Sequence, residues 1–195
     1  EKEYYFDDKF AAQRGAYIDY LERTFRNIGQ ANPRESASRV MAFETYVAEL
    51  NWDAEQKRQI EKINNPMSGT QLASYAPGVD WNAFFQGNNI PPQDRIIVTD
   101  NTAVKAIAAL YASTDLDTLK LWEKAHIADQ ASPFLNKKMV DSRFQFTSAL
   151  NGTSEQRARW KRAVDTIDGS LGEQVGKAYV AEYFPKIAKT RMDAL

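Results

Sequence analysis

The chain has 195 residues, of which 43% are hydrophobic and 12% aromatic, so it can bury a core and form one domain, or one domain with an annex. Its 25 Lys and Arg residues are balanced by 26 Asp and Glu residues, which argues against nucleic acid or an acidic membrane as the main partner. Without cysteine it has no disulfide, thiolate metal site or thiol nucleophile, and no apolar run approaches the roughly 18 residues that cross a bilayer.

The N-terminal part predicts two helices. Asp7 or Asp8 can cap the first, and Gly29 is expected to end it. Pro33 suits the first turn of a second helix that reaches Leu50. The apolar faces of the two helices comprise Phe10, Tyr17, Leu21, Phe25 and Ile28, and then Val40, Phe43, Val47 and Leu50.

Two glutamates, Glu44 and Glu49, lie on or near the edge of the second helix. Paired carboxylates on a helix can bind metal in a di-iron bundle, but such a bundle needs Glu-x-x-His repeats, and the sequence has none. We therefore expect both glutamates to be solvated or salt-bridged.

The middle of the chain predicts short elements. Asn64-Asn65-Pro66-Met67 is a firm break, after which Thr70 can start a short helix. Asp80 is expected to cap another short helix, which ends at Gly87. The run 95–99 is the one convincing β-like stretch and is interpreted as an extended connector or an edge pairing.

Three further helices are predicted before residue 150. Asp100 is expected to cap the helix 104–111, and Thr114 or Asp115 the helix 116–128. Ser132-Pro133 opens the next helix, whose apolar side comprises Leu135, Met139, Phe146 and Leu150.

A long helix is predicted after Asn151-Gly152, which breaks the chain. Thr153 and Gln156 have the spacing of a capping box at its start. Apolar residues then recur at steps of three and four over about seven turns, as on one face of a helix. They are Trp160, Val164, Ile167, Leu171, Val175 and Tyr179.

Three glycines, Gly169, Gly172 and Gly176, fall inside this helix, where each costs about 1 kcal/mol relative to alanine. The favoured interpretation is tight helix–helix packing, and the alternative is a hinge or a ligand-facing groove. The basic run Arg157 to Arg162 around Trp160 is interpreted as a solvated helix face rather than a nucleic-acid patch, because the whole chain is not basic. Asn151-Gly152-Thr153 has the form of a glycosylation acceptor, but we favour a turn and helix cap.

No catalytic motif is present. His126 is the single histidine, in the context Lys-Ala-His-Ile-Ala, and is interpreted as an ordinary helix residue rather than a lone metal ligand or a proton carrier. A Gly-x-Ser-x-Gly elbow and the phosphate-binding glycine motifs are missing as well. We therefore assign no catalytic, cofactor-binding or metal-binding residue in this chain.

One stretch, 143–185, resembles a known family. The residues that carry the resemblance are Leu150, Gly152, Thr153, Arg157, Arg159, Trp160, Lys161, Arg162, Val164, Asp165, Gly169, Leu171 to Glu173, Val175 to Lys177, Tyr179, Val180, Tyr183 and Phe184. Their pattern is similar to that of the neprilysin family of zinc metalloendopeptidases, in its bacterial branch. The opening 3–28, with its Tyr-Tyr pair and acidic residues, and the Asn-Pro-Met triplet at 65–67 resemble the same family. Residues 59–63 depart from it, since the family usually carries Arg-Asp-Pro there.

The resemblance implies an all-α, multi-helix lobe with one long helix in its C-terminal half and at most a minor extended segment. It implies that 1–195 is a non-catalytic lid domain, cut at both ends from a larger peptidase. In the family, zinc is bound by His-Glu-x-x-His and a further carboxylate, and this chain has no such motif. Zinc and catalysis are therefore expected in a catalytic lobe outside these residues.

The partners implied by the resemblance are that catalytic lobe and peptide substrates, with no nucleic acid and no membrane segment in this chain. The lid would limit the size of substrates. The resemblance also implies that the parent protein is periplasmic or secreted, although this chain leaves the compartment open. The alternative is a free-standing helical interaction module, which the aromatic content and the missing catalytic residues would also fit.

Overall fold

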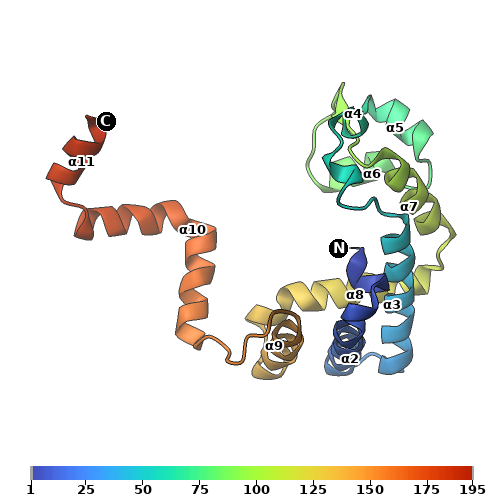
Figure 1. Ribbon diagram of the computed structural model, residues 1–195, viewed down its shortest axis with the longest axis horizontal. Helices are drawn as coiled ribbons and strands as arrows, with labels where there is room; N and C mark the ends of the chain where they lie inside the picture. The colour runs from blue at the N-terminus through green and yellow to red at the C-terminus, as the bar shows by residue number, and fades with distance from the viewer. Residues whose placement is uncertain (1, 195) are drawn as a thin grey trace. The chain divides into compact units, whose positions relative to one another are not determined.

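The computed structural model describes residues 2–194, which form two compact units divided after Gly152 (Figure 1). Within the described residues, the predicted all-α class is confirmed, since helices dominate and the β structure is one two-stranded sheet. The first unit comprises α1 (Glu3–Phe6), η1 (Asp8–Phe10), α2 (Ala11–Asn27), α3 (Pro33–Leu50), η2 (Gln56–Arg58), α4 (Ile60–Ile63), β1 (Pro66–Met67), α5 (Gly69–Tyr75), α6 (Trp81–Gly87), β2 (Ile96–Ile97), α7 (Asn101–Ser113), α8 (Leu116–Ala131), η3 (Ser132–Phe134) and α9 (Lys137–Asn151). The second unit comprises α10 (Arg159–Tyr183) and α11 (Lys186–Asp193).

The ends of the first two long helices follow local chemistry. Asp7 was predicted to cap the long helix α2. Instead it caps the short η1, where its side chain accepts a hydrogen bond from the Lys9 backbone N–H. Gly29, with φ of +77°, follows the end of α2 as predicted, because this left-handed conformation favours glycine. Pro33 occupies the first turn of α3, also as predicted.

The N-caps of the later helices confirm some predictions and correct others. Asp80 and Asp115 cap α6 and α8 as expected. Ser68, not Thr70, caps α5, because Ser68 and Gln71 form a reciprocal capping box. The predicted helix after Ser132 is split into η3 and α9, since Asn136 caps a new helix by accepting from the backbone N–H of Met139.

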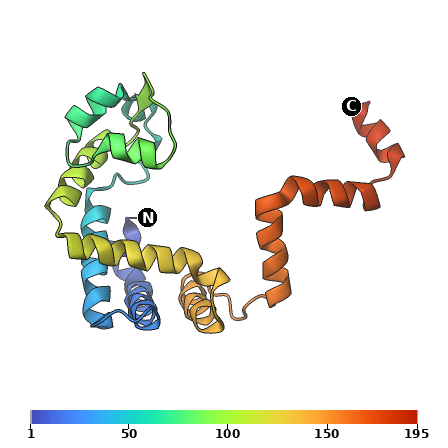
Figure 2. The same cartoon turned by 180° about the vertical axis from the view of Figure 1, so that it is seen from behind.

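The main core of the first unit lies where α2, α3 and α8 pack together, and α9 lies against α2 (Figures 1 and 2). Tyr20 and Phe146 stack across α2 and α9 with ring centroids 5.0 Å apart. The buried residues of this core are Leu21, Phe25, Ala37, Val40, Leu121 and Ala125. Of the predicted apolar faces, Leu21, Phe25, Val40, Phe43 and Met139 are buried, whereas Ile28, Leu135 and Leu150 are exposed.

A second, smaller core joins α5, α7 and the sheet around Leu72, Ala76, Val98 and Ala108. Strands β1 and β2 pair antiparallel, with Pro66 opposite Ile97. The edge pairing predicted for 95–99 is thus confirmed. The loop before α6 comes very close to α7, where a Cβ placed on Gly78 would lie 2.0 Å from the carbonyl oxygen of Ala108.

The long helix of the second unit differs from its prediction at its start. Thr153 and Gln156 precede α10, which begins at Arg159 with Ala158 as its N-cap and no side-chain capping bond. The predicted capping box is therefore wrong. Near the start of α10, Arg157 pairs with Asp165 at 3.0 Å, and Arg162 Nε donates to the Arg157 carbonyl at 3.1 Å.

The same helix bends where its glycines cluster (Figure 1). Leu171 has non-helical angles, φ −132° and ψ 31°, between Gly169 and Gly172. A Cβ on Gly169, Gly172 or Gly176 would meet no atom within 4 Å, so the second unit itself does not provide the close packing that we favoured for these glycines. A kink at this point is consistent with the hinge of the alternative interpretation.

We expect the substitution Gly78→Ala to destabilise the first unit by about 1–3 kcal/mol, because the new methyl group can only fit if the backbone of α7 moves. Urea unfolding of the chain measures this change. Gly87→Ala is the matched control, because a Cβ there meets nothing within 4 Å. Equal midpoints for the two variants would show that the contact between Gly78 and Ala108 is not tight.

Candidate functional site

One buried carboxylate connects four elements of the first unit. Glu44 on α3 is only 7% exposed. Its Oε1 accepts hydrogen bonds from the Tyr17 hydroxyl of α2 at 3.1 Å and contacts Nε2 of His126 on α8 at 2.8 Å. Its Oε2 accepts from the Tyr5 hydroxyl of α1 at 3.2 Å. We call Tyr5, Tyr17, Glu44 and His126 the Glu44 cluster.

Helical spacing explains how these side chains meet. Glu44 lies one turn after Val40, which is fully buried in the core, so it points inward from α3. His126 follows Ala125, another core residue, and lies one turn after Trp122 on α8. The rings of Trp122 and His126 are 4.7 Å apart, so the imidazole lies between an indole and a carboxylate.

The electrostatics of the cluster favour one protonation pattern. Burial raises the pKa of Tyr5 and of Tyr17 well above the usual range, and the nearby charge of Glu44 adds to the effect. Both phenols therefore remain protonated donors. The hydrogen bond with Glu44 raises the pKa of His126, although partial burial opposes the shift. Glu44 has three donors around it, so its buried charge is compensated.

Another tyrosine of α2 also donates its hydroxyl to a carboxylate. The Tyr20 hydroxyl of α2 donates to Asp129 of α8 at 2.6 Å, and burial raises the pKa of Tyr20 to about 12. Arg143 of α9 also contacts Asp129, at 3.0 Å. Asp129 thus joins α8 to both α2 and α9.

The structure adds detail to the interpretation of these residues. Glu44 forms an ion-pair contact with His126 and Glu49 is exposed, in line with the prediction that the two glutamates are salt-bridged or solvated. His126 lies on α8, as predicted for a helix residue, and its half-buried ring also contacts Glu44. The register of Glu44, four residues after Val40 and three before Val47, was the signal in the sequence that placed this carboxylate on the apolar face.

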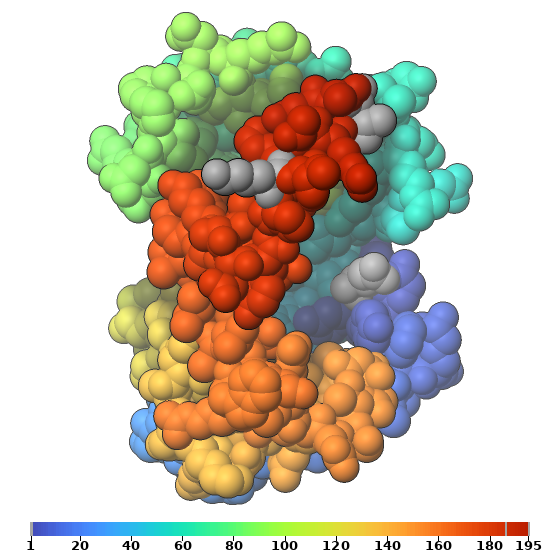
Figure 3. Space-filling view, turned by 90° about the vertical axis from the view of Figure 1, so that its left-hand side faces the viewer, coloured from blue at the N-terminus to red at the C-terminus, as the bar shows by residue number. Residues whose placement is uncertain are grey.

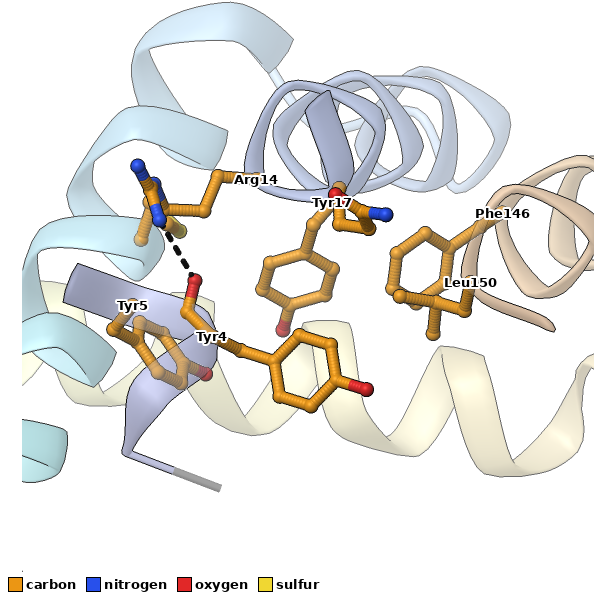
Figure 4. Close-up of a pocket in the computed structure, with 8 residues that line it drawn as sticks. Tyr4, Tyr5, Arg14, Tyr17, Phe146 and Leu150 are labelled. Carbon is orange, nitrogen blue, oxygen red and sulfur yellow. Dashed lines mark hydrogen bonds between the residues drawn. The ribbon is translucent and has the colours of Figure 1, made fainter. Parts of the chain in front are cut away.

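Tyr5 lines two hollows. One has a volume of about 350 Å³ and is lined mainly by rings and aliphatic side chains of α1, α2 and α9 (Figure 4). In that view Tyr4 and Tyr17 face Phe146 and Leu150, and Arg14 donates to the Tyr4 carbonyl at 3.1 Å. The other hollow has about 320 Å³, and Glu44, His126, Trp52 and Trp122 are among its lining residues.

The described residues offer no zinc site. Residues 2–194 contain no group of three His, Cys, Asp or Glu side chains arranged to hold a metal ion. A catalytic zinc site needs three protein ligands, and the pair formed by Glu44 and His126 falls short of that number. Both side chains also use their facing atoms in hydrogen bonds with the cluster.

The predicted apolar face of the long helix is present but open. Among the described residues, Trp160 is 66% exposed, Ile167 50% and Tyr179 61%. Figure 3 shows the side chains on one face of α10 and α11, in orange to red. The basic run is solvated as predicted, and Lys161 Nζ lies 5.4 Å from the centre of the Trp160 ring. No described helix is long and apolar enough to span a lipid bilayer.

The fold and the cluster define a helical domain. A sequence model described as Peptidase family M13 matches residues 1–195. The chain belongs to this peptidase family and corresponds to the N-terminal region of neprilysin-like zinc metalloproteases. The resemblance seen in the sequence is thereby confirmed.

Similar proteins support the assignment. Endothelin-converting enzyme 1 of Rattus norvegicus is 25% identical over 181 residues, which cover 89% of this chain and 24% of that enzyme. Neprilysin-2 of Drosophila melanogaster is 27% identical over 165 residues, which cover 76% of this chain and 21% of that protein.

Solved structures of the zinc metalloprotease Zmp1 from Mycobacterium tuberculosis have the same fold. The open state gives a TM-score of 0.91 at 29% identity and covers 99% of this chain and 31% of that one. The complex with an inhibitor gives a TM-score of 0.90 at 28% identity and covers 100% of this chain and 30% of that one. The chain thus spans about a fifth to a third of the length of these relatives.

We expect Glu44→Gln to destabilise the first unit by about 1–3 kcal/mol. The glutamine amide nitrogen can only donate hydrogen bonds, so one of the groups that donate to Glu44 would lose its acceptor. Glu49→Gln, on the exposed side of the same helix, should change stability by no more than about 0.5 kcal/mol. Urea unfolding of both variants measures the difference. Equal effects would mean that the Glu44 cluster does not hold the unit together.

Proposed function

We propose that this chain is the non-catalytic helical lobe of an M13 zinc metalloendopeptidase, which closes over the zinc-bearing lobe and restricts substrates to peptides. The observation that carries the proposal is the match of the whole chain to the family, over only about a third of the length of the solved structures. The remaining part of such a protein would supply the catalytic lobe.

The chemistry of the described residues supports a structural role. They provide no metal-ligand group, so zinc chemistry would depend on residues outside them. A lobe that covers a cleft acts by excluding water and by limiting what can enter. In a water-poor site, electrostatic interactions are stronger, because the local dielectric constant is lower.

The open face of α10 supports the same proposal. A row of exposed apolar side chains this long is unusual on a solvent-exposed helix, because it leaves much apolar area in water. Coverage of the row by the rest of a longer polypeptide would remove this cost. Full burial of one aliphatic side chain contributes about 1.5–3 kcal/mol, so the row could fix the lobe firmly.

A substitution in this row tests the coverage. We expect Ile167→Asp to lower the melting temperature of the complete gene product markedly, because a carboxylate would replace a buried side chain. In the 195-residue chain, where Ile167 is 50% exposed, the same change should have little effect. Differential scanning fluorimetry of both proteins measures the contrast. Glu173→Gln, on the opposite face of α10, is the matched control. An equally small shift in both proteins would show that no part of the polypeptide covers this face.

The size limit is tested with substrates. The complete gene product should cleave a short fluorogenic peptide, lose that activity with a chelator, and leave the same sequence uncut inside a folded protein loop. The 195-residue chain should cleave neither substrate. Chelator-sensitive cleavage by the chain alone would overturn the assignment of a non-catalytic lobe. A complete product of this same length that captures a protein partner would favour the free-standing interaction module instead.

A further inference from the structure

We propose that the contact between Glu44 and His126 is a proton-controlled link, which fastens α8 to α3 more strongly as the pH falls below neutrality. The link lies at the point where α1, α2, α3 and α8 meet on one carboxylate. Its effect would therefore spread through the core of the first unit. This inference depends on the first unit alone and stands or falls independently of the proposed peptidase function.

The composition makes His126 the single side chain that can respond in this pH range. The sequence has one histidine and no cysteine. Unperturbed carboxyl groups titrate near pH 4, and phenols and amines near pH 10. Burial moves Tyr5 and Tyr17 further away from neutrality. His126 is therefore the side chain whose ordinary pKa lies in the range in which we expect the change in stability.

The surroundings of the imidazole favour its charged form. Glu44 faces it from α3, and Glu123 and Asp129 lie nearby on α8 itself. Tyr5 of α1 and Tyr17 of α2 remain neutral and donate to the same carboxylate. Lys2 and Lys57 line the adjoining hollow.

Both of those cations have partners of their own. Lys2 Nζ donates to the Glu49 carbonyl at 2.8 Å and to the Asn51 carbonyl at 3.1 Å. Lys57 Nζ lies 3.5 Å from Asp100 Oδ2. The carboxylate in direct contact with the imidazole is therefore the dominant neighbour.

The sign of the effect follows from proton linkage. The pKa of His126 in the folded chain is raised above the value of about 6.5 for an unfolded chain. The folded state then binds a proton more tightly than the unfolded state. The added stability is fully present below pH 6.5 and is lost as the pH rises through the folded pKa. Above that pH a neutral imidazole N–H can still donate to Glu44, so the contact weakens without disappearing.

The experiment starts with proton NMR of the 195-residue chain, where the C2–H signal of the one imidazole needs no assignment. The titration should give a pKa above that of the same chain unfolded in urea. Glu44→Gln should return the value toward that of the unfolded chain, and Glu49→Gln should leave it unchanged. A folded pKa at or below the unfolded one would overturn the proposal.

A second measurement connects the proton to stability. His126→Gln keeps a donor near Glu44 but cannot titrate. We expect wild type to melt a few degrees above this variant at pH 5.5 and the gap to narrow steadily toward pH 8.5. A gap that is constant over this range would contradict the link, because it would show packing without proton dependence. If the variant does not fold, the NMR titration of wild type and Glu44→Gln decides alone.

Discussion

The first unit depends on one buried charge. Glu44 is almost completely removed from water, and a carboxylate in that position is tolerated only when hydrogen bonds replace its hydration. Tyr5, Tyr17 and His126 provide them, each from a different element. The N-terminal turn α1, which is too short to be stable by itself, is thereby tied to the long helices. Removal of the Tyr5 hydroxyl would leave the charge in place and the turn less firmly held.

The second unit has the opposite problem, because its apolar side chains lack cover within that unit. Its longest helix has an apolar row on one face and three glycines on another, with a kink at Leu171 between two of them. Glycine lowers the cost of bending, since its backbone reaches conformations that other residues avoid. A helix of this kind suits a part of the protein that must adapt to a neighbour. Membership of family M13 supports a neighbour within a longer polypeptide.

Much of the fold could be predicted from the sequence, because apolar spacing and turn residues are local signals. Gly29, Pro33, Asp80 and Asp115 act as expected. Helix caps were predicted less well where two candidate capping residues lie close together in the sequence. Ser68, and not Thr70, caps α5, because Ser68 and Gln71 form a reciprocal capping box. The Glu44 cluster could not be predicted, since Tyr5 and His126 are 121 positions apart in the sequence and meet only after the helices pack. The close approach of Gly78 to Ala108 likewise depends on tertiary packing.

The measurement that tests the account most directly is the mass of the native gene product in its source cell, detected with an antibody against this chain. The account predicts a single protein roughly three or more times the 22.1 kDa of this chain, since the chain covers 31% of the open-state structure of Zmp1. A product of 22.1 kDa would contradict it. The helical lobe would then be a complete protein, and the open face of α10 would need a separate partner.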